Sequence, residues 1–202
     1  MKRFGIFGGA FDPPHRAHRV LAETALAQLA LDALFVLPTG QAWHKNHPLT
    51  PATHRLAMAR LAFADLPQVQ VDDRETRRSG PTYTYDTLLA LQQEHPNAHW
   101  FLVIGADQAA AFTTWHRWQD IVQLTSLVVA ERPADAQSAT GAVSLQWHNA
   151  LPVDVQRLAM PMLAVSATQI RQNLAHDVQT ATWLDPKVAD YIRQHHLYTA
   201  AP

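Results

Sequence analysis

Short apolar runs alternate with helical patterns along most of this 202-residue chain. Each run is only three or four residues long, which suits a strand buried on both faces, and most of the segments between the runs carry apolar residues at helical spacing. The runs are Phe4–Phe7, Leu34–Leu37, Val69–Val71, Phe101–Ile104 and Leu127–Ala130. Strands that alternate with helices form a parallel sheet, so the pattern predicts an α/β fold with a doubly wound parallel sheet covered by helices on both faces.

Local signals at helix ends support this organisation. Thr50-Pro51 is typical of an N-cap and first helical position, and it predicts a helix through Leu61. Asp185-Pro186 predicts another helix, through Ile192. We expect a single domain over residues 1–202, with a small helical part at about 166–198.

One stretch gives a weaker pattern. The residues from Pro133 to Pro152 are mostly small and polar, and they are interpreted as a variable surface connection with a strand near Val143–Trp147.

Composition excludes several classes of protein. The 16 basic and 17 acidic residues leave a net charge of −1, which argues against a general nucleic-acid binder. The absence of cysteine excludes disulfides, zinc-thiolate sites and thiol nucleophiles. No apolar run approaches the ~18 residues that span a membrane, and no signal peptide precedes the first run, so we expect a cytoplasmic protein without a membrane partner. Homo-oligomer formation stays open, because the pattern does not separate an exposed apolar patch from a core face.

The segment after the first run has the features of a phosphate-binding turn. Gly8-Gly9 lets a ligand approach the bare backbone, and helical spacing begins after Pro13-Pro14. His15 and His18 then fall in the first helical turn and share a face where the helix dipole attracts anions. A metal site would need a third ligand, which no HExxH pattern and no cysteine supplies, so no protein metal site is predicted.

This segment resembles the signature of a nucleotidyltransferase superfamily, Gly-Gly-(Thr)-Phe-Asp-Pro-x-His-x-Gly-His. The matching residues are Gly8, Gly9, Phe11, Asp12, Pro13, His15 and His18. Ala10 occupies the usual threonine position and Ala17 occupies the glycine position. The resemblance implies a Rossmann-like fold in which ATP contacts the backbone from Gly8 to Phe11 and both histidines, while Asp12 contacts the acceptor nucleotide.

A second anion site is predicted near the end of the chain. A short apolar run leads to Ser166, the expected N-cap of a helix, and Arg171 follows one turn later. An ordinary capped helix would also explain Ser166. The segment resembles the family motif Ile-Ser-(Ala/Ser)-Thr-x-Ile-Arg, with Val165 in place of isoleucine, which implies that Ser166, Thr168 and Arg171 bind ATP.

In a doubly wound sheet the ligand lies beyond the carboxyl ends of the strands. Gly105 and Asp107 follow the fourth run and resemble the family's Gly-x-Asp, which implies a contact with the nucleotide sugar. His44 and Lys45 follow the second run and resemble the family's Pro-Pro-His-(Lys/Arg), which implies a contact with the mononucleotide, although solvated loop charges would look the same. Arg132, after the fifth run, is a further candidate phosphate ligand.

A third motif narrows the substrate. The segment Glu75–Leu88 resembles the run Glu-x-x-Arg-x-x-x-Ser-Tyr-Thr-x-x-Thr-Leu of bacterial nicotinate-nucleotide adenylyltransferases, with Thr82 in place of serine. A Gly-Pro turn leads into a helix whose first amides, near Thr84, can hold a carboxylate. The resemblance implies that Trp115 stacks on the nicotinate ring and that His116 takes the place of a tyrosine, whereas core packing is the ordinary role of a tryptophan.

Together the resemblances imply transfer of AMP from ATP to nicotinate mononucleotide, which yields deamido-NAD and pyrophosphate. Such chemistry depends mainly on aligning two anions and neutralising charge, so no covalent intermediate is needed, and Mg²⁺ is expected to accompany ATP. The predicted charge-stabilising catalytic set is His15, His18, Lys45 and Arg171.

Two alternatives stay open. Another transferase of the superfamily would use nicotinamide mononucleotide or phosphopantetheine as acceptor. A regulatory module would bind ATP without turning it over, an idea that the departures at Ala10 and Ala17 motivate.

Overall fold

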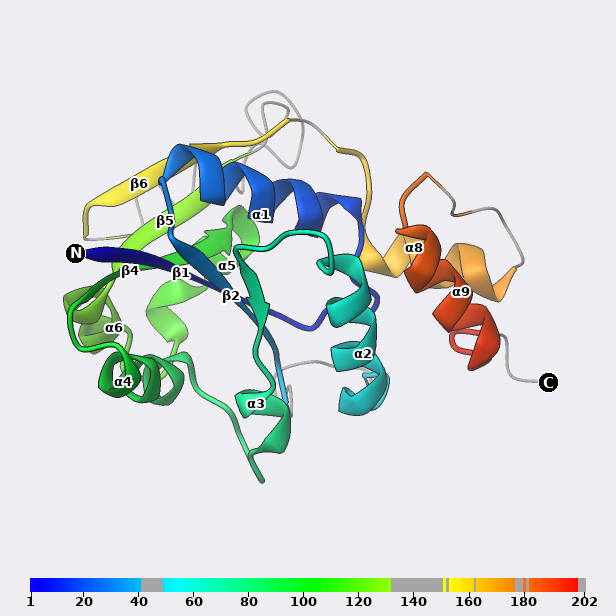
Figure 1. Ribbon diagram of the computed structural model, residues 1–202, viewed down its shortest axis with the longest axis horizontal. Helices are drawn as coiled ribbons and strands as arrows, with labels where there is room; N and C mark the ends of the chain where they lie inside the picture. The colour runs from blue at the N-terminus through cyan, green and yellow to red at the C-terminus, as the bar shows by residue number, and fades with distance from the viewer. Residues whose placement is uncertain are drawn as a thin grey trace.

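A computed structural model describes residues 1–40, 49–131, 151, 153–161, 163–176, 180 and 182–199. Its strands form one sheet in the order β3-β2-β1-β4-β5-β6, and every neighbouring pair is parallel (Figure 1). The strands are β1 (Lys2–Gly9), β2 (Ala33–Pro38), β3 (Val69–Val71), β4 (Ala98–Gly105), β5 (Ser126–Glu131) and β6 (Val155–Ala159). Strands β2 and β3 follow outward from β1 on one side of the sheet, and β5 and β6 follow outward from β4 on the other. This order confirms the predicted doubly wound, Rossmann-like α/β fold.

All five predicted runs lie within strands, but the sequence did not predict β6. Only Leu158 of this strand is buried, so the alternation that marks a half-buried strand is missing. Its backbone pairing with β5 at the edge of the sheet makes it a strand. The strand expected near Val143–Trp147, and nearly all of the surface connection from Pro133 to Pro152, lie outside the described residues.

The helices divide between the two faces of the sheet. One group is α1 (Arg16–Gln28), α2 (Ala52–Ala62), α8 (Ala167–Ala175) and α9 (Pro186–Gln194). The other includes α4 (Thr84–Glu94), α5 (Ala106–Ala110), the 3-10 turn η1 (Phe112–Thr114) and α6 (Trp118–Leu124), while the short α3 (Arg74–Arg77) follows β3. Figure 1 shows α1 and α2 on one side of the sheet and α4 and α6 on the other.

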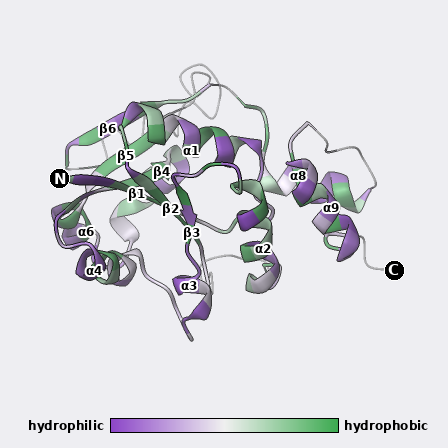
Figure 2. Cartoon of the chain, viewed as in Figure 1, coloured by the Kyte–Doolittle hydropathy of each residue, from purple (hydrophilic) through white to green (hydrophobic). Residues whose placement is uncertain are grey.

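Successive strand residues belong to two separate cores, because side chains of a strand alternate between its faces. Val36 and Val103 pack with the α1 group, whereas Phe35 and Leu102 pack with the α4 group. Figure 2 shows hydrophobic residues concentrated in the strands and hydrophilic residues along the outer helices. The apolar runs of β1, β2, β4 and β5 therefore lie in the buried part of the sheet, as the sequence predicts. The run in β3 is different, because this edge strand is only partly buried and exposes Gln70.

The C-terminal helices share the core of the α1 face through Ile170, Val188 and Ile192. Both begin as predicted. The Ser166 Oγ accepts a hydrogen bond from the Gln169 amide at 3.2 Å, and a carboxylate oxygen of Asp185 accepts one from the Lys187 amide at 2.8 Å.

Helix α2 starts one residue later than predicted, at Ala52, with Pro51 as its N-cap. Thr50 makes tertiary contacts instead. Its amide donates to the Asp12 carboxylate at 3.1 Å, and its carbonyl accepts from the Arg55 guanidinium at 2.8 Å. Within the described ranges, no helix is both long and apolar enough to cross a membrane.

Candidate active site

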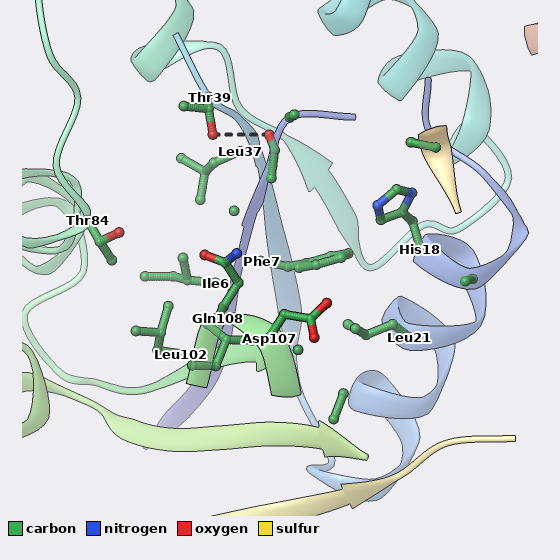
Figure 3. A pocket seen from close by; sticks show the side chains of 18 of the residues that line it. Ile6, Phe7, His18, Leu21, Leu37, Thr39, Thr84, Leu102, Asp107 and Gln108 are labelled. Carbon is green, nitrogen blue, oxygen red and sulfur yellow. Dashed lines mark hydrogen bonds between the residues drawn. The ribbon is translucent and has the colours of Figure 1, made fainter. Parts of the chain in front are cut away.

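A cavity of about 570 Å³ opens where the carboxyl ends of β1 and β4 meet (Figure 3). The order of the strands reverses between β1 and β4, which is the position where doubly wound sheets bind ligands. The predicted site residues that line it are Gly8, Gly9, Ala10, His15, His18, Thr84, Gly105, Asp107, Trp115 and Ser166. The structure therefore brings residues from every described motif to one pocket.

The pocket has two sides (Figure 3). On one side, the imidazole of His18 and the side chain of Leu21 extend from α1, and the Asp107 carboxylate of α5 points toward them. On the other side, Thr84 at the start of α4 faces Ile6. We call these the α1 side and the α4 side of the pocket.

Bare backbone faces this pocket at two glycines. A Cβ atom built on Gly8 or on Gly105 would meet no protein atom within 4 Å, although both residues line the cavity. A ligand can therefore approach the backbone closely at the ends of β1 and β4, as the sequence predicts for a phosphate-binding turn.

The two histidines form a close pair at the start of α1. His15 is the N-cap residue and His18 the third residue of the helix, and their ring centroids lie 3.8 Å apart. The backbone amide of His15 donates to the Nδ1 of His18 at 3.1 Å. An Nδ1 that accepts carries no proton, so this bond assigns the proton to Nε2 and makes His18 a neutral donor. Its ring faces the pocket (Figure 3), where the N–H can meet a phosphate oxygen.

Phe11 packs against His18 on the protein side of the histidine pair. Its backbone has a φ of 50°, a left-handed conformation that is uncommon outside glycine. Its ring is 1% exposed and packs 5.0 Å from the His18 ring and 5.3 Å from the Phe7 ring, measured between centroids. Phe11 is not among the residues that line the pocket in the described part of the chain, so it orients His18 through packing.

Asp12 points into the protein rather than into the described pocket lining. Its carboxylate is 3% exposed and accepts hydrogen bonds from the Tyr198 hydroxyl at 2.5 Å and from the Thr50 amide at 3.1 Å. Burial, followed by the negative charge of Asp12, raises the pKa of the Tyr198 phenol. No sequence motif includes Tyr198 or predicts its contact with Asp12.

The two family signatures meet at Asp12. A guanidinium nitrogen of Arg171 donates to the Asp12 carbonyl at 2.8 Å across 159 residues of sequence, and a second nitrogen lies 3.4 Å from the Thr168 hydroxyl. Ser166 lines the pocket, whereas Thr168 and Arg171 are not among the described residues that line it. The predicted second anion site therefore adjoins the first.

The α4 side contains buried polar groups. The Arg78 guanidinium donates to the Thr87 hydroxyl, and this hydroxyl donates to the Glu75 carboxylate, each at 2.9 Å. Glu75 is 8% exposed, and burial raises the pKa of its carboxyl. Thr82 also lines the pocket, and its buried hydroxyl has no hydrogen-bond partner among the described residues.

The aromatic residues of this side differ in position. Trp115 is half-buried, lines the pocket and packs 5.3 Å from the Phe112 ring, so it contributes both to the core and to the site. His116 is exposed and packs against Tyr83 with ring centroids 4.4 Å apart and the rings tilted by 36°, outside the described pocket lining. The predicted contacts of His44, Lys45 and Arg132 fall on residues outside those that the structure describes.

A buried arginine that no sequence motif predicts binds the backbone of three segments around the site. The Arg55 guanidinium is 1% exposed and donates to the carbonyls of Ala10, Gly40 and Thr50 at 2.8 to 3.0 Å. Burial lowers the pKa of Arg55, and the nearby Asp12 carboxylate opposes that shift. An arginine within a helical pattern is ordinarily read as solvent-exposed, so the sequence contains no local signal for this role.

No group of three or more side chains suited to a metal ion occurs within the described ranges. The polar groups that line the pocket are instead helix amides, hydroxyls, imidazoles and isolated carboxylates. The amides, hydroxyls and imidazole N–H groups can donate hydrogen bonds to an anionic ligand, whereas a carboxylate can accept them from ligand hydroxyls.

Comparison with known proteins identifies the class to which this fold and site belong. The family model described as cytidylyltransferase-like matches residues 6–173, so the chain belongs to that family. Its curated relatives narrow the assignment. A protein of Albidiferax ferrireducens is 51% identical over the full length of both chains, and one of Methylibium petroleiphilum is 42% identical over 98% of this chain and 92% of its own. Both are named probable nicotinate-nucleotide adenylyltransferase, and at these identities the chain is a member of their family, as predicted.

Solved structures agree on the fold. The nicotinic acid mononucleotide adenylyltransferase of Plasmodium falciparum complexed with NaAD superposes with a TM-score of 0.78, at 21% identity and 98% coverage of both chains. A putative nicotinate-nucleotide adenylyltransferase of Vibrio parahaemolyticus gives a TM-score of 0.70 at 21% identity, covering 100% of this chain and 98% of its own. The Rossmann-like architecture is therefore shared with solved structures.

Proposed function

We propose that this protein transfers the adenylyl group of ATP to nicotinate mononucleotide, which gives deamido-NAD and pyrophosphate. The observation that carries the proposal is the contact of Arg171 with the Asp12 carbonyl, which joins two anion-binding segments beside one two-sided pocket. Two relatives named for the same activity support it, and the match covers 100% and 92% of their lengths.

The α1 side is assigned to ATP. The backbone from Gly8 to Ala10 and the N–H of His18 meet the phosphates, and the amides after Ser166 add donors at the start of α8. Gly105 and Asp107 lie at the end of β4, where Asp107 can accept hydrogen bonds from ribose hydroxyls. Mg²⁺ is expected to enter with the triphosphate as part of that substrate.

The α4 side is assigned to the mononucleotide. The first amides of α4 near Thr84 are donors for the nicotinate carboxylate, as is the Thr82 hydroxyl, which has no partner among the described residues. The half-buried Trp115 offers a ring on which the pyridine can stack. The proposed contacts of His44, Lys45 and Arg132 with the mononucleotide rest on the sequence alone.

In the proposed reaction a phosphate oxygen of the mononucleotide attacks the α-phosphorus of ATP, and the bond from that phosphorus to the bridging oxygen breaks as pyrophosphate leaves. No covalent enzyme intermediate forms. His15 and His18 stabilise the charge that develops on the phosphates, together with Lys45 and Arg171. The neutral His18 donates its Nε2 proton in a hydrogen bond and does not transfer it.

Pyrophosphate release tests the proposal. The purified protein is assayed with ATP and Mg²⁺ and, in parallel, with nicotinate mononucleotide, nicotinamide mononucleotide or phosphopantetheine. We expect rapid release with nicotinate mononucleotide and formation of deamido-NAD. Release with another acceptor alone would assign a different transferase activity, and ATP binding without release in any arm would indicate a regulatory nucleotide-binding module.

A further inference from the structure

We propose that Tyr198, near the C-terminal end of the chain, is a positioning residue for adenylyl transfer. Its hydroxyl holds the Asp12 carboxylate and so fixes the turn between β1 and α1 that carries both histidines. This inference rests on the proposed function, and it assigns Asp12 to the support of the turn rather than to direct contact with the mononucleotide.

The contact joins residues that are far apart in sequence. The Tyr198 hydroxyl and Asp12 are separated by 186 residues, and their atoms lie 2.5 Å apart. The second carboxylate oxygen of Asp12 accepts from the Thr50 amide at 3.1 Å, and the Asp12 carbonyl accepts from Arg171 at 2.8 Å. The turn is therefore anchored from three separate segments, each through Asp12.

The charges around Asp12 make the tyrosine a suitable anchor. The carboxylate is almost fully buried, and a buried carboxylate needs donors and a compensating cation. The buried Arg55 guanidinium supplies the cation through its Coulombic interaction with Asp12, while its own N–H groups donate to backbone carbonyls. A phenol is a protonated donor at neutral pH, and burial and the charge of Asp12 raise the pKa of Tyr198 further.

The backbone of the C-terminal segment is bent to reach this position. His196 and Tyr198 have φ values of 49° and 62°, a left-handed conformation that has a free-energy cost for residues other than glycine. The Leu197 amide between them donates to the Ile192 carbonyl at 3.0 Å, which turns the chain back at the end of α9. Local preference alone would not select two such residues, so a tertiary contact must offset the cost.

The turn connects this contact to the reacting groups. Asp12 lies three residues before the N-cap His15, the neighbouring Phe11 packs against the His18 ring, and the Asp12 carbonyl holds Arg171. A displacement of about 1 Å in a reacting group can cost about 100-fold in rate. Loss of the Tyr198 hydroxyl should therefore lower turnover without removing any group that contacts substrate.

The test compares Tyr198→Phe with Tyr191→Phe. Both variants lose one hydroxyl from the same C-terminal segment. The Tyr191 hydroxyl lies 2.9 Å from the Nδ1 of His54, an interaction that does not involve Asp12. We expect Tyr198→Phe to lower kcat by about tenfold or more, as for the loss of a hydrogen bond to a charged group, with KM for both substrates within about twofold of wild type. Tyr191→Phe should leave both parameters within about twofold.

A kcat of Tyr198→Phe within twofold of wild type, or a fall matched by Tyr191→Phe, would overturn the proposal. A rise in KM for nicotinate mononucleotide with unchanged kcat would also overturn it, because that result would indicate direct binding through Asp12. Thermal unfolding of both variants separates these outcomes from a general loss of stability.

A second readout does not depend on turnover. Nitrogen-15 NMR of the histidine rings reports which ring nitrogen carries the proton. We expect Tyr198→Phe to shift the His18 resonances and Tyr191→Phe to shift those of His54. If the wild type releases no pyrophosphate, the proposed function fails, and the His18 resonances alone decide the positioning role. Unchanged His18 resonances in Tyr198→Phe would then refute it.

Discussion

The α1 side and the α4 side of the pocket are stabilised in different ways. On the α1 side, Asp12 connects the histidine turn to Thr50, Arg171 and Tyr198 through hydrogen bonds over long sequence distances. On the α4 side, the hydrogen bonds from Arg78 through Thr87 to Glu75 stay within one segment, and the Thr82 hydroxyl has no partner in the part of the chain that the structure describes. The first arrangement suits precise placement of reacting groups, and the second suits recognition of an acceptor. Mutations on the α1 side should therefore act on kcat or on folding, and those on the α4 side on KM.

The largest effect is expected for Arg55→Met, which removes the buried cation of the α1 side. Three carbonyls lose their donor and Asp12 loses its compensating charge. The free energy of unfolding should fall by about 3–5 kcal/mol, measured by urea denaturation. Arg60→Met on the same helix removes an ion pair at 3.4 Å that is largely exposed, and it serves as the control, with an expected change of about 0–1 kcal/mol. Equal losses in both variants would contradict a special role for Arg55.

His18→Ala tests the chemistry of the α1 side. Removal of one donor that stabilises developing charge typically lowers kcat by about 10²–10³-fold. The KM for nicotinate mononucleotide should change little, because the α4 side is intact. Steady-state kinetics with both substrates varied checks this, and near-normal turnover would remove His18 from the catalytic set. His54→Ala on α2 is the matched histidine control, with kcat expected close to wild type.

Trp115→Ala tests the α4 side, where we expect a change in KM rather than in kcat. Loss of stacking on a base typically costs about 1–3 kcal/mol, which corresponds to a rise of about 5- to 150-fold in KM for the mononucleotide. The kcat at saturation and the KM for ATP should change much less. Trp118→Ala, which removes a partly buried tryptophan of the same core, controls for lost packing. A selective fall in kcat for Trp115→Ala would reverse the distinction between the two sides.

Glu75→Gln has the smallest expected effect and depends on pH. Burial raises the pKa of Glu75 above its ordinary value of 4.5, so the folded state retains a proton that the unfolded chain has released. The wild type therefore loses stability as pH rises from 4.5 through the raised pKa, and Glu75→Gln lacks this loss. Urea denaturation across that range should show the variant gaining stability relative to wild type, whereas Glu94→Gln, at an exposed ion pair, should follow wild type. A constant difference for Glu75→Gln would contradict the raised pKa.

The same contrast explains how much of the site the sequence predicts. Gly8, His18, Ser166 and Thr84 sit in motifs whose meaning is local, because a glycine turn or a helix start has the same properties in any fold, and all four line the pocket. Asp12 belongs to such a motif, yet its side chain turns inward to Thr50 and Tyr198. A motif therefore predicts which part of the fold a residue occupies more reliably than which neighbours its side chain contacts.

The sequence by itself determined the five strands from β1 to β5, the capped starts of α8 and α9, and the family. Each of these depends on hydrophobic pattern, glycine and proline chemistry or hydrogen bonds between residues a few positions apart. Only the tertiary structure decided that β6 joins the sheet, that Arg55 is buried and that Tyr198 reaches Asp12. These features depend on pairing and charge compensation between segments that are distant in the chain, which no local pattern records.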